Sequence, residues 1–332
     1  MITKNLFDKV LIDPVKNGAD KLYIVSGYAT AAMTFHHFEA IKKTLGKQIQ
    51  INLIVGMCSY DGLSLSNHKA FQQLASVDFP NLFECSYIVN APQVHSKAYA
   101  WFQGRKPISG FVGSANYTQN AFSKAQRELL VSCDPKQGLD YYQSLISDSI
   151  YCTHNEIENH IEIYRDTYYG RKKKEQLEKQ GLQLITSAKP DLQDLPAIRI
   201  SFLSRTDELP QRSGLNWGQR PEERREPNQA YIKLPSSVYN TDFFPQIAVD
   251  FTVLTDDNKV LICTRAQQNG KAIHTPHNNS LIGEYFRNRL GIPSGHPVAK
   301  EDLLRYGRTD IDFYKIDDET YFMDFSVSAR NG

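Results

Sequence analysis

The chain has 332 residues, which favours two domains because a single hydrophobic core rarely grows beyond about 250–300 residues. Its 38 lysines and arginines balance 37 aspartates and glutamates, so the summed charge points to no partner and only local charge can indicate a polyanion. No run of about 18 uncharged apolar residues is present, which excludes a membrane-spanning helix. The N-terminal segment carries acids and lacks a signal-peptide core, and the five cysteines match neither a disulfide framework nor paired CxxC zinc knuckles, so a cytoplasmic protein is expected.

The first half alternates short apolar strands with segments of helical periodicity. Strands are expected at residues 21–26, 49–55, 82–89, 95–102, 108–113 and 129–133, and helices at 33–46, 65–74, 139–147 and 155–163. Strands separated by helices predict an α/β domain over residues 1–165, with a mixed sheet flanked by helices.

The composition changes near residue 166. Residues 166–193 are rich in Lys, Glu and Gln and contain the basic run 171–174, which fits a charged, partly helical linker with a solvated face or, alternatively, a strap on phosphates. Beyond it, strands are expected at 197–204, 229–234, 246–254, 260–266, 313–316 and 320–325, with helices at 281–290 and 300–306. Short strands with two helices predict a small barrel-like β domain over residues 194–332.

A candidate catalytic motif, HSK followed by GSAN, lies on consecutive strands of the first half. Residues two apart in a strand share a face, so His95 and Lys97 are expected to project to the same side. The turn at Gly113 allows a close backbone approach, which would place Ser114 and Asn116 near that face.

These side chains suit chemistry on phosphate esters. A neutral imidazole at His95 can attack phosphorus, while the Lys97 ammonium and the Asn116 amide hold the charged oxygens. Glu128 lies in the segment 126–128, which is expected to begin another strand, and it could orient His95 and stabilise its imidazolium.

This pattern resembles the HxK–GSxN signature of the phospholipase D superfamily. The resemblance implies a covalent phosphohistidine on one histidine and a second histidine that protonates the leaving oxygen. The superfamily usually has Asp five residues after the lysine, where this chain has Phe102. That departure disfavours the lipid-cleaving branch and leaves Glu128 as the candidate carboxylate.

The chain contains one HxK, although the mechanism requires one neutral and one protonated histidine. A twofold homodimer formed through the nuclease domain, in which two copies of His95 meet, is the simplest solution. Because histidine would supply both nucleophile and acid, neither a metal nor another cofactor is expected.

Two loops of the second half combine arginine, which suits guanine edges, with side-chain amides that suit adenine. The candidate DNA-binding residues are Arg212, Ser213, Asn216, Trp217, Gln219, Arg220, Arg224, Arg225 and Asn228 in the 212–229 loop, and Thr264, Arg265, Gln267, Gln268 and Lys271 in the 264–271 loop. Each loop alone also fits a solvated turn, and Trp217 also fits an anchor within the domain. Two such loops on one barrel are typical of arms that grip a groove.

The segments LNWGQR and EPNQAYIKLP resemble the DNA-recognition domain of NgoFVII-type restriction endonucleases. That β-pseudobarrel, with two helices here, is similar to the plant B-three domain and to the effector domain of EcoRII, and the first half is similar to the nuclease domain of BfiI. The resemblance implies a prokaryotic, metal-independent endonuclease specific for a site in double-stranded DNA. Some members are encoded with a methyltransferase and a separate helicase-like ATPase, which are therefore possible partners.

The leading hypothesis is a homodimeric, type II-like restriction endonuclease. A phosphodiesterase acting on lipids or nonspecifically on nucleic acid is one alternative, which Phe102 and the arginine–amide loops disfavour. A catalytically inactive, sequence-specific DNA-binding protein is the other, which is disfavoured because His95, Lys97 and Asn116 are all present.

Overall fold

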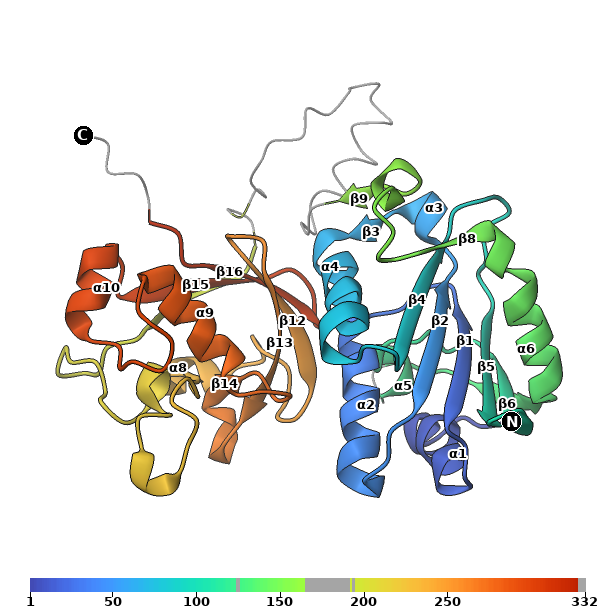
Figure 1. The fold of residues 1–332 in the computed structure, drawn as a ribbon, viewed down its shortest axis with the longest axis horizontal. Helices are drawn as coiled ribbons and strands as arrows, with labels where there is room; N and C mark the ends of the chain where they lie inside the picture. The colour runs from blue at the N-terminus through green and yellow to red at the C-terminus, as the bar shows by residue number, and fades with distance from the viewer. Residues whose placement is uncertain (124–125, 165–191, 193–194, 328–332) are drawn as a thin grey trace. The chain divides into compact units, whose positions relative to one another are not determined.

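The computed structural model describes residues 1–123, 126–164, 192 and 195–327 (Figure 1). The chain divides into two compact units, Met1–Tyr164 and Arg165–Gly332. Apart from Leu192, the segment predicted as a charged linker, residues 166–193, lies outside the described residues. None of the helices described is both long and apolar enough to cross a bilayer.

The first unit is built on a seven-stranded sheet with the order β7-β6-β5-β1-β2-β4-β8. In chain order its strands are β1 (Lys21–Ser26), β2 (Gln50–Val55), β4 (Phe83–Ile88), β5 (Lys97–Gln103), β6 (Lys106–Gly113), β7 (Leu130–Cys133) and β8 (Ser149–Tyr151). Strands β1, β2 and β4 run parallel, whereas β5, β6, β7 and β8 join the sheet by antiparallel pairing. The predicted α/β fold with a mixed sheet is confirmed.

Helices cover both faces of this sheet (Figure 1). They are α1 (Asp13–Lys16), α2 (Ala31–Leu45), α3 (Cys58–Asp61), α4 (Leu65–Gln73), α5 (Gln119–Phe122) and α6 (Pro135–Ser144), with π-helical turns η1 (Phe7–Ile12) and η2 (Leu74–Asp78). Side chains alternate across β5, where Trp101 packs edge-on against His37 of α2 and Ala98 lies in a hydrophobic cluster with Tyr142 of α6. Lys97 lies four residues before Trp101 in the same strand, so its side chain points to the same face of the sheet, the face covered by α2.

Two predicted elements of the first unit differ in the structure. The strand expected at 95–102 begins at Lys97, so His95 lies in the preceding loop. The helix expected at 155–163 is wrong: it contracts to the 3-10 turn η4 (Ile157–Asn159), and β9 (Ile163–Tyr164) pairs in parallel with β3 (Leu63–Ser64). Pairing with a distant strand outweighs the helical periodicity of that segment.

The second unit contains a seven-stranded, nearly closed barrel-like sheet with the order β10-β15-β16-β12-β13-β14-β11. Its strands are β10 (Ala197–Ser201), β11 (Ile232–Lys233), β12 (Asp250–Thr255), β13 (Val260–Ala266), β14 (Ala272–His274), β15 (Asp310–Lys315) and β16 (Thr320–Asp324), and its helices are α8 (Ser236–Tyr239), α9 (Leu281–Leu290) and α10 (Lys300–Tyr306). Strands β12 and β16 pair in parallel and the other neighbours pair antiparallel. The predicted pseudobarrel is confirmed.

Aromatic side chains fill the centre of this barrel. The ring of Phe244 lies 5.7 Å from that of Phe251, 5.2 Å from that of Phe313 and 5.0 Å from that of Tyr321, measured between centroids. The last three residues are fully buried on β12, β15 and β16. Burial of such large apolar rings stabilises the barrel and fixes the positions of the loops that leave it.

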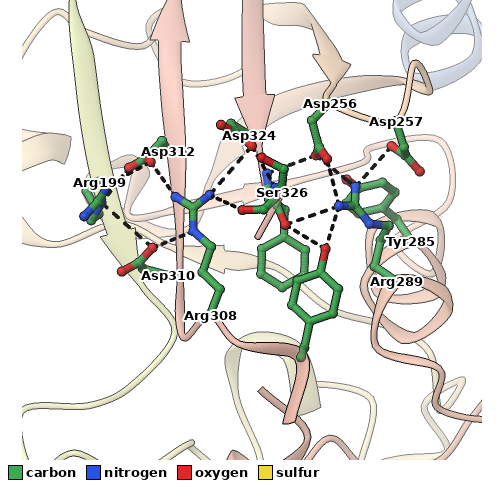
Figure 2. A network of polar contacts seen from close by, with 12 residues as sticks. Arg199, Asp256, Asp257, Tyr285, Arg289, Arg308, Asp310, Asp312, Asp324 and Ser326 are labelled. Carbon is green, nitrogen blue, oxygen red and sulfur yellow. Dashed lines mark hydrogen bonds and ion pairs between the residues drawn. The ribbon is translucent and has the colours of Figure 1, made fainter. Parts of the chain in front are cut away.

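A network of arginines and aspartates joins β10, β15 and β16 on the barrel surface (Figure 2). Arg199 donates two hydrogen bonds to Asp312, at 2.7 and 3.0 Å, and Arg308 contacts Asp310, Asp312 and the carbonyl of Ser326. Beside it, Arg289 of α9 holds the turn after β12 through Asp256 and Asp257. The network therefore links the edge strand β10 to the centre of the sheet.

Candidate active site and recognition loops

Four strand ends bring the predicted catalytic motif to one edge of the first sheet. Ser26, the last residue of β1, pairs in register with Lys97, the first residue of β5. Gly113, the last residue of β6, pairs with Leu130, the first residue of β7. Because β5 lies between β1 and β6, the segments that follow β1 and β6 and that precede β5 and β7 meet at this edge.

Lys97 contacts His95 in two ways. Its Nζ donates to the His95 carbonyl oxygen at 2.8 Å and lies 3.3 Å from each of the two ring nitrogens. An ammonium has no acceptor and can donate only to a ring nitrogen that carries no hydrogen, so this contact suits a neutral imidazole. A neutral imidazole is the form that can act as a nucleophile.

Lys97 is buried, with 6% of the residue exposed, whereas His95 is exposed at the end of the sheet. Burial lowers the pKa of Lys97, and the negative charge of Glu128 opposes this effect. A phosphate oxygen beside Nζ would favour the ammonium in the same way, because a nearby opposite charge stabilises the charged form. The site therefore suits an anionic ligand.

Asn116 is held by the segment that follows β1. Its Oδ1 accepts a hydrogen bond from the backbone N–H of Tyr28 at 3.1 Å. The Ser26 hydroxyl braces this segment, since it donates to the Tyr28 carbonyl at 2.6 Å and accepts from the Tyr117 N–H at 2.9 Å. With Oδ1 used as an acceptor, the Nδ2 group of Asn116 is the one that can donate to a phosphate oxygen.

Gly27 allows His95 and Asn116 to approach each other. A Cβ atom at this position would lie 3.2 Å from Cδ2 of His95 and 3.5 Å from Oδ1 of Asn116. Both side chains therefore lie in the space that a larger residue at position 27 would occupy. The structure therefore brings His95, Lys97 and Asn116 together, as the motif predicts.

Ser114 and Glu128 form a pair of their own. The Ser114 hydroxyl donates to Oε2 of Glu128 and accepts from the N–H of Leu129 at 3.1 Å. Glu128 was expected to orient His95, but its hydrogen bond in the structure is with Ser114, and it acts on Lys97 through its charge. It also precedes β7 instead of beginning it, because strand pairing starts at Leu130.

Tyr28 belongs to the site although the sequence reasoning did not single it out. Its ring meets that of His95 edge-on, with 6.0 Å between centroids, and its hydroxyl donates to Oδ2 of Asp61. An aromatic residue directly after a strand whose end meets the HxK strand was the available signal. It could be recognised only once β1 and β5 were known to be neighbours.

The recognition loops expose some of the predicted DNA-binding residues and bury others. Exposed residues are Arg212, Arg224, Gln267, Gln268 and Lys271, half-buried residues are Ser213, Trp217, Gln219, Arg220 and Arg225, and buried residues are Asn216, Asn228, Thr264 and Arg265. The exposed and half-buried side chains remain candidates for contact with DNA.

The two buried asparagines of the 212–229 loop have structural roles instead. Asn216 donates to the carbonyl of Val298 and accepts from its N–H, both at 2.8 Å. Asn228 donates to the hydroxyl of Ser294 at 2.8 Å and accepts from the N–H of Gly295 at 2.7 Å. Both amides are used within the domain, which corrects the expectation that they read bases.

The same correction applies at the 264–271 loop. Thr264 donates to a backbone carbonyl, that of Val249, at 3.1 Å. Arg265 donates to several carbonyls, among them those of Tyr239 at 2.7 Å and Gly270 at 3.0 Å. Arg265 is 7% exposed, and its guanidinium satisfies backbone carbonyls, so it organises the loop and is not presented to a ligand.

Two further side chains shape the 212–229 loop. Trp217 packs edge-on against Tyr231 and carries the guanidinium of Arg225 at 4.2 Å from its ring, so it serves partly as an anchor. Arg287, which the sequence reasoning missed, is 1% exposed and donates to the carbonyls of Leu215 and Pro227, both at 3.3 Å. An arginine on the apolar face of α9 was the signal for that role.

The fold and the site together define a phospholipase D-type nuclease domain joined to a DNA-binding pseudobarrel. Residues 4–159 match the family model described as the NgoFVII restriction endonuclease N-terminal PLD domain, and residues 191–317 match the NgoFVII C-terminal B3-like DNA-binding domain. The chain therefore belongs to the NgoFVII restriction endonuclease family. No curated protein matches it.

Solved structures give weaker similarities. NucT from Helicobacter pylori is 17% identical, with a TM-score of 0.32, and the match covers 45% of this chain and 96% of that one. Polyphosphate kinase from Porphyromonas gingivalis is 13% identical, with a TM-score of 0.31, over 54% of this chain and 28% of the kinase.

Proposed function

We propose that this restriction endonuclease hydrolyses DNA phosphodiester bonds at specific sites, with His95 as the nucleophile. The observation that carries the proposal is the contact of the buried Lys97 ammonium with both the ring and the carbonyl of His95. This arrangement supports attack by a neutral imidazole on a phosphate whose oxygens are held by Lys97 and Asn116.

The reaction would proceed in two displacements. A ring nitrogen of His95 forms a bond to phosphorus, the bond from phosphorus to the leaving oxygen breaks, and a protonated histidine donates its proton to that oxygen. Water then attacks the phosphohistidine, its proton passes to the second histidine, and the phosphorus–nitrogen bond breaks. Lys97 and Asn116 stabilise the charge that develops on the remaining oxygens in both steps.

The second histidine would come from another copy of the chain. His37 is fully buried and bonded to Tyr117, and burial lowers its pKa to about 3. His68 is buried and bonded to Tyr87. Neither can donate a proton to an exposed leaving oxygen, and the six other histidines lack the HxK pattern. We therefore infer a homodimer through the nuclease domain in which two copies of His95 share one site. A single shared site would cut the two DNA strands in sequence.

We also propose that cleavage is metal-independent and that the second unit selects the site. The Lys97 ammonium and the Asn116 amide supply the positive charge and the hydrogen bonds that a metal supplies elsewhere. The exposed side chains of the 212–229 and 264–271 loops would contact the groove. A cognate methyltransferase would protect host sites, and a separate helicase-like ATPase is a further proposed partner.

The test is cleavage of DNA of varied sequence by the purified full-length chain alone, in EDTA, with His95→Ala and the control His160→Ala. His160 is exposed on the same unit and lies outside the site. Wild type and His160→Ala should release discrete fragments, whereas His95→Ala should bind DNA without cutting it. A bell-shaped pH profile is expected, because one histidine must be neutral and the other protonated.

Each contrary result removes a defined part of the proposal. Loss of cleavage in EDTA excludes the metal-free mechanism, and full activity of His95→Ala excludes His95 as nucleophile. A continuous smear of fragments identifies a nonspecific nuclease. Sequence-selective binding without any cleavage identifies an inactive DNA-binding protein, unless addition of an ATPase subunit and ATP restores cutting, which establishes that partner.

A further inference from the structure

The 212–229 loop neutralises most of its own positive charge. It carries four arginines, Arg212, Arg220, Arg224 and Arg225, and three glutamates, Glu222, Glu223 and Glu226. Glu226 is engaged in hydrogen bonds within the domain, because its Oε2 accepts from the Ser280 hydroxyl and from the N–H of Asn228. Glu222 pairs with Arg212. Glu223 faces Arg220 and Arg225.

Glu223 bridges these arginines with its two oxygens. Oε1 accepts from Nη1 of Arg220 at 3.0 Å, and Oε2 accepts from Nε of Arg225 at 2.7 Å. The hydrogen bond from Arg225 lowers the pKa of Glu223, and Arg220 contributes in the same direction. The carboxylate therefore holds a place between two guanidinium groups that a phosphate group could fill, since both anions accept the same pairs of N–H groups.

Both arginines are also supported by contacts that do not involve Glu223. Arg225 lies over the ring of Trp217, 4.2 Å from its centroid. Arg220 donates from Nε and Nη2 to the carbonyl of Arg212, at 3.0 and 2.8 Å. The two guanidinium groups would therefore keep their places if the carboxylate were replaced.

Exchange of the carboxylate for a phosphate is energetically easy. The Glu223 side chain is 39% exposed and its two partners are 27% and 25% exposed. Ion pairs at such sites contribute little, because water screens both charges. When a DNA backbone displaces Glu223, two arginine–phosphate contacts form, but the two contacts between Glu223 and the arginines are lost. The exchange also brings a phosphate close to the displaced carboxylate.

We propose that Glu223 is an internal competitor that occupies Arg220 and Arg225 until a cognate site displaces it. This inference rests on the proposed function as a site-specific DNA-binding endonuclease. On random DNA the exchange yields almost no net gain, because nonspecific affinity follows the number of arginine–phosphate contacts. At a cognate site, base contacts made by the loops add the free energy that completes the exchange.

The experiment measures binding of Glu223→Gln in the full-length chain, on a His95→Ala background that prevents cleavage. Two kinds of probe are titrated over a range of salt concentrations. One is random-sequence duplex DNA, and the other is duplex DNA that the His95→Ala protein, with its loops unchanged, has selected from a random pool. Glu301→Gln is the control, since it makes the same charge change at an exposed residue of α10. Thermal melting of each variant verifies that it is folded.

Glu223→Gln should bind random-sequence DNA about three- to tenfold more tightly, with a steeper dependence on salt, because two more arginines become free for phosphates. Binding to the enriched duplexes should rise at least as much, because the wild type must displace the carboxylate in that complex. The salt dependence of that binding should stay unchanged, because the two arginines already contact phosphates there. Glu301→Gln should change neither affinity as much as twofold. Unchanged or weaker binding of random DNA by Glu223→Gln, or a salt dependence that steepens equally for both probes, overturns the inference.

The same experiment separates this inference from the proposed function. If the background protein binds no duplex, or enriches no sequence, the proposed site-specific function fails first. If it enriches a sequence and Glu223→Gln leaves both the affinity for random duplexes and its salt dependence unchanged, the function stands and only the role of Glu223 is rejected.

Discussion

Lys97 Nζ lies 2.8 Å from the carbonyl oxygen of His95, so the lysine of the HxK motif is hydrogen-bonded to the backbone of the histidine in the same motif. The hydrogen bond spans two residues across the beginning of β5, where Lys97 is already in the sheet and His95 is not. The position of the imidazole thus depends on a buried ammonium, and the two side chains form one unit.

Replacing this lysine by methionine separates its role in cleavage from its role in folding. Lys97→Met should lower the single-turnover cleavage rate by about 10²–10³-fold, because it removes a positive group that faces the developing charge. Its melting temperature should stay equal or rise. Burial lowers the pKa of Lys97 relative to the unfolded chain, so at neutral pH the protonated side chain destabilises the folded state, and its removal relieves that effect.

Lys106→Met is the matched control for this substitution. Lys106 is exposed and begins β6, at the end of the strand opposite to Gly113. It should cleave like the wild type. Cleavage by Lys97→Met within twofold of the wild-type rate would show that the ammonium has no part in catalysis.

Tyr28 is predicted to position the His95 ring. Tyr28→Phe keeps the edge-on contact but loses the bond to Asp61, and should lower kcat about three- to tenfold. Tyr28→Ala removes the contact and should lower kcat about a hundredfold, since small misplacements of a reacting group are costly. KM should change little in both variants, because the loops that would bind DNA are untouched. Steady-state kinetics measure kcat and KM separately for each variant.

Tyr60→Phe serves as the control for Tyr28→Phe. Tyr60 lies in α3, beside Asp61, and is 72% exposed. It should behave as wild type in kcat and KM. A Tyr28→Ala variant with normal kcat, or one in which KM alone rises, would contradict a positioning role.

Arg220 and Arg265 should respond to alanine substitution in opposite ways. Arg220→Ala should weaken binding to the recognised site by about 1–3 kcal/mol, because it removes an arginine that contacts the DNA there, with no change in melting temperature. Arg265→Ala should instead lower the free energy of unfolding by about 2–4 kcal/mol, because it leaves several buried carbonyls without donors. Fluorescence anisotropy and urea unfolding measure the two effects. A folded, fully stable Arg265→Ala with altered site preference would show that the guanidinium reaches DNA.

Local sequence pattern predicted most of the fold, but not where loop side chains point. The strands 21–26 and 260–266 and the helices 281–290 and 300–306 match the structure at both ends. Each is a periodic segment, and apart from the start of 300–306, which follows Ala299, each end is bounded by a polar residue or glycine. Strand β12 begins at Asp250 and not at 246, since Ala248 just before it has a positive φ of 64° and leaves the extended conformation.

The site residues divide in the same way. His95, Lys97 and Asn116 come together because the strand order brings their strand ends to one edge, and the motif spacing carries that information. Asn216 looks like a solvated loop amide in the sequence, yet it bonds to Val298, which lies far along the chain. Burial of a loop side chain depends on such distant partners, and no local pattern encodes them.

The arginine–aspartate network of the pseudobarrel predicts that the stability of the fold depends on pH, and substitution of one residue, Asp312, tests this (Figure 2). Burial raises the pKa of Asp312, but the hydrogen bonds from Arg199 and Arg308 outweigh this effect, and the pKa is lowered overall. A carboxylate whose pKa is lower in the folded state stabilises the fold above its unfolded pKa, about 3.9, and this contribution is lost as the pH falls through the folded pKa.

Asp312→Asn should therefore lower the free energy of unfolding by about 1–3 kcal/mol at pH 7, where the carboxylate is charged in both states. The difference from wild type should begin to shrink below about pH 4, where the carboxyl of the unfolded chain becomes protonated, and should disappear as the pH falls through the lower pKa of the folded state. Urea unfolding between pH 3 and pH 7 measures it, and Asp318→Asn is the control, since Asp318 is 74% exposed and pairs with Lys315 at the surface. The control should differ from wild type by less than about 0.5 kcal/mol at either pH. A difference for Asp312→Asn that is constant over this range would mean that the charge of Asp312 does not contribute, and that the network acts through packing.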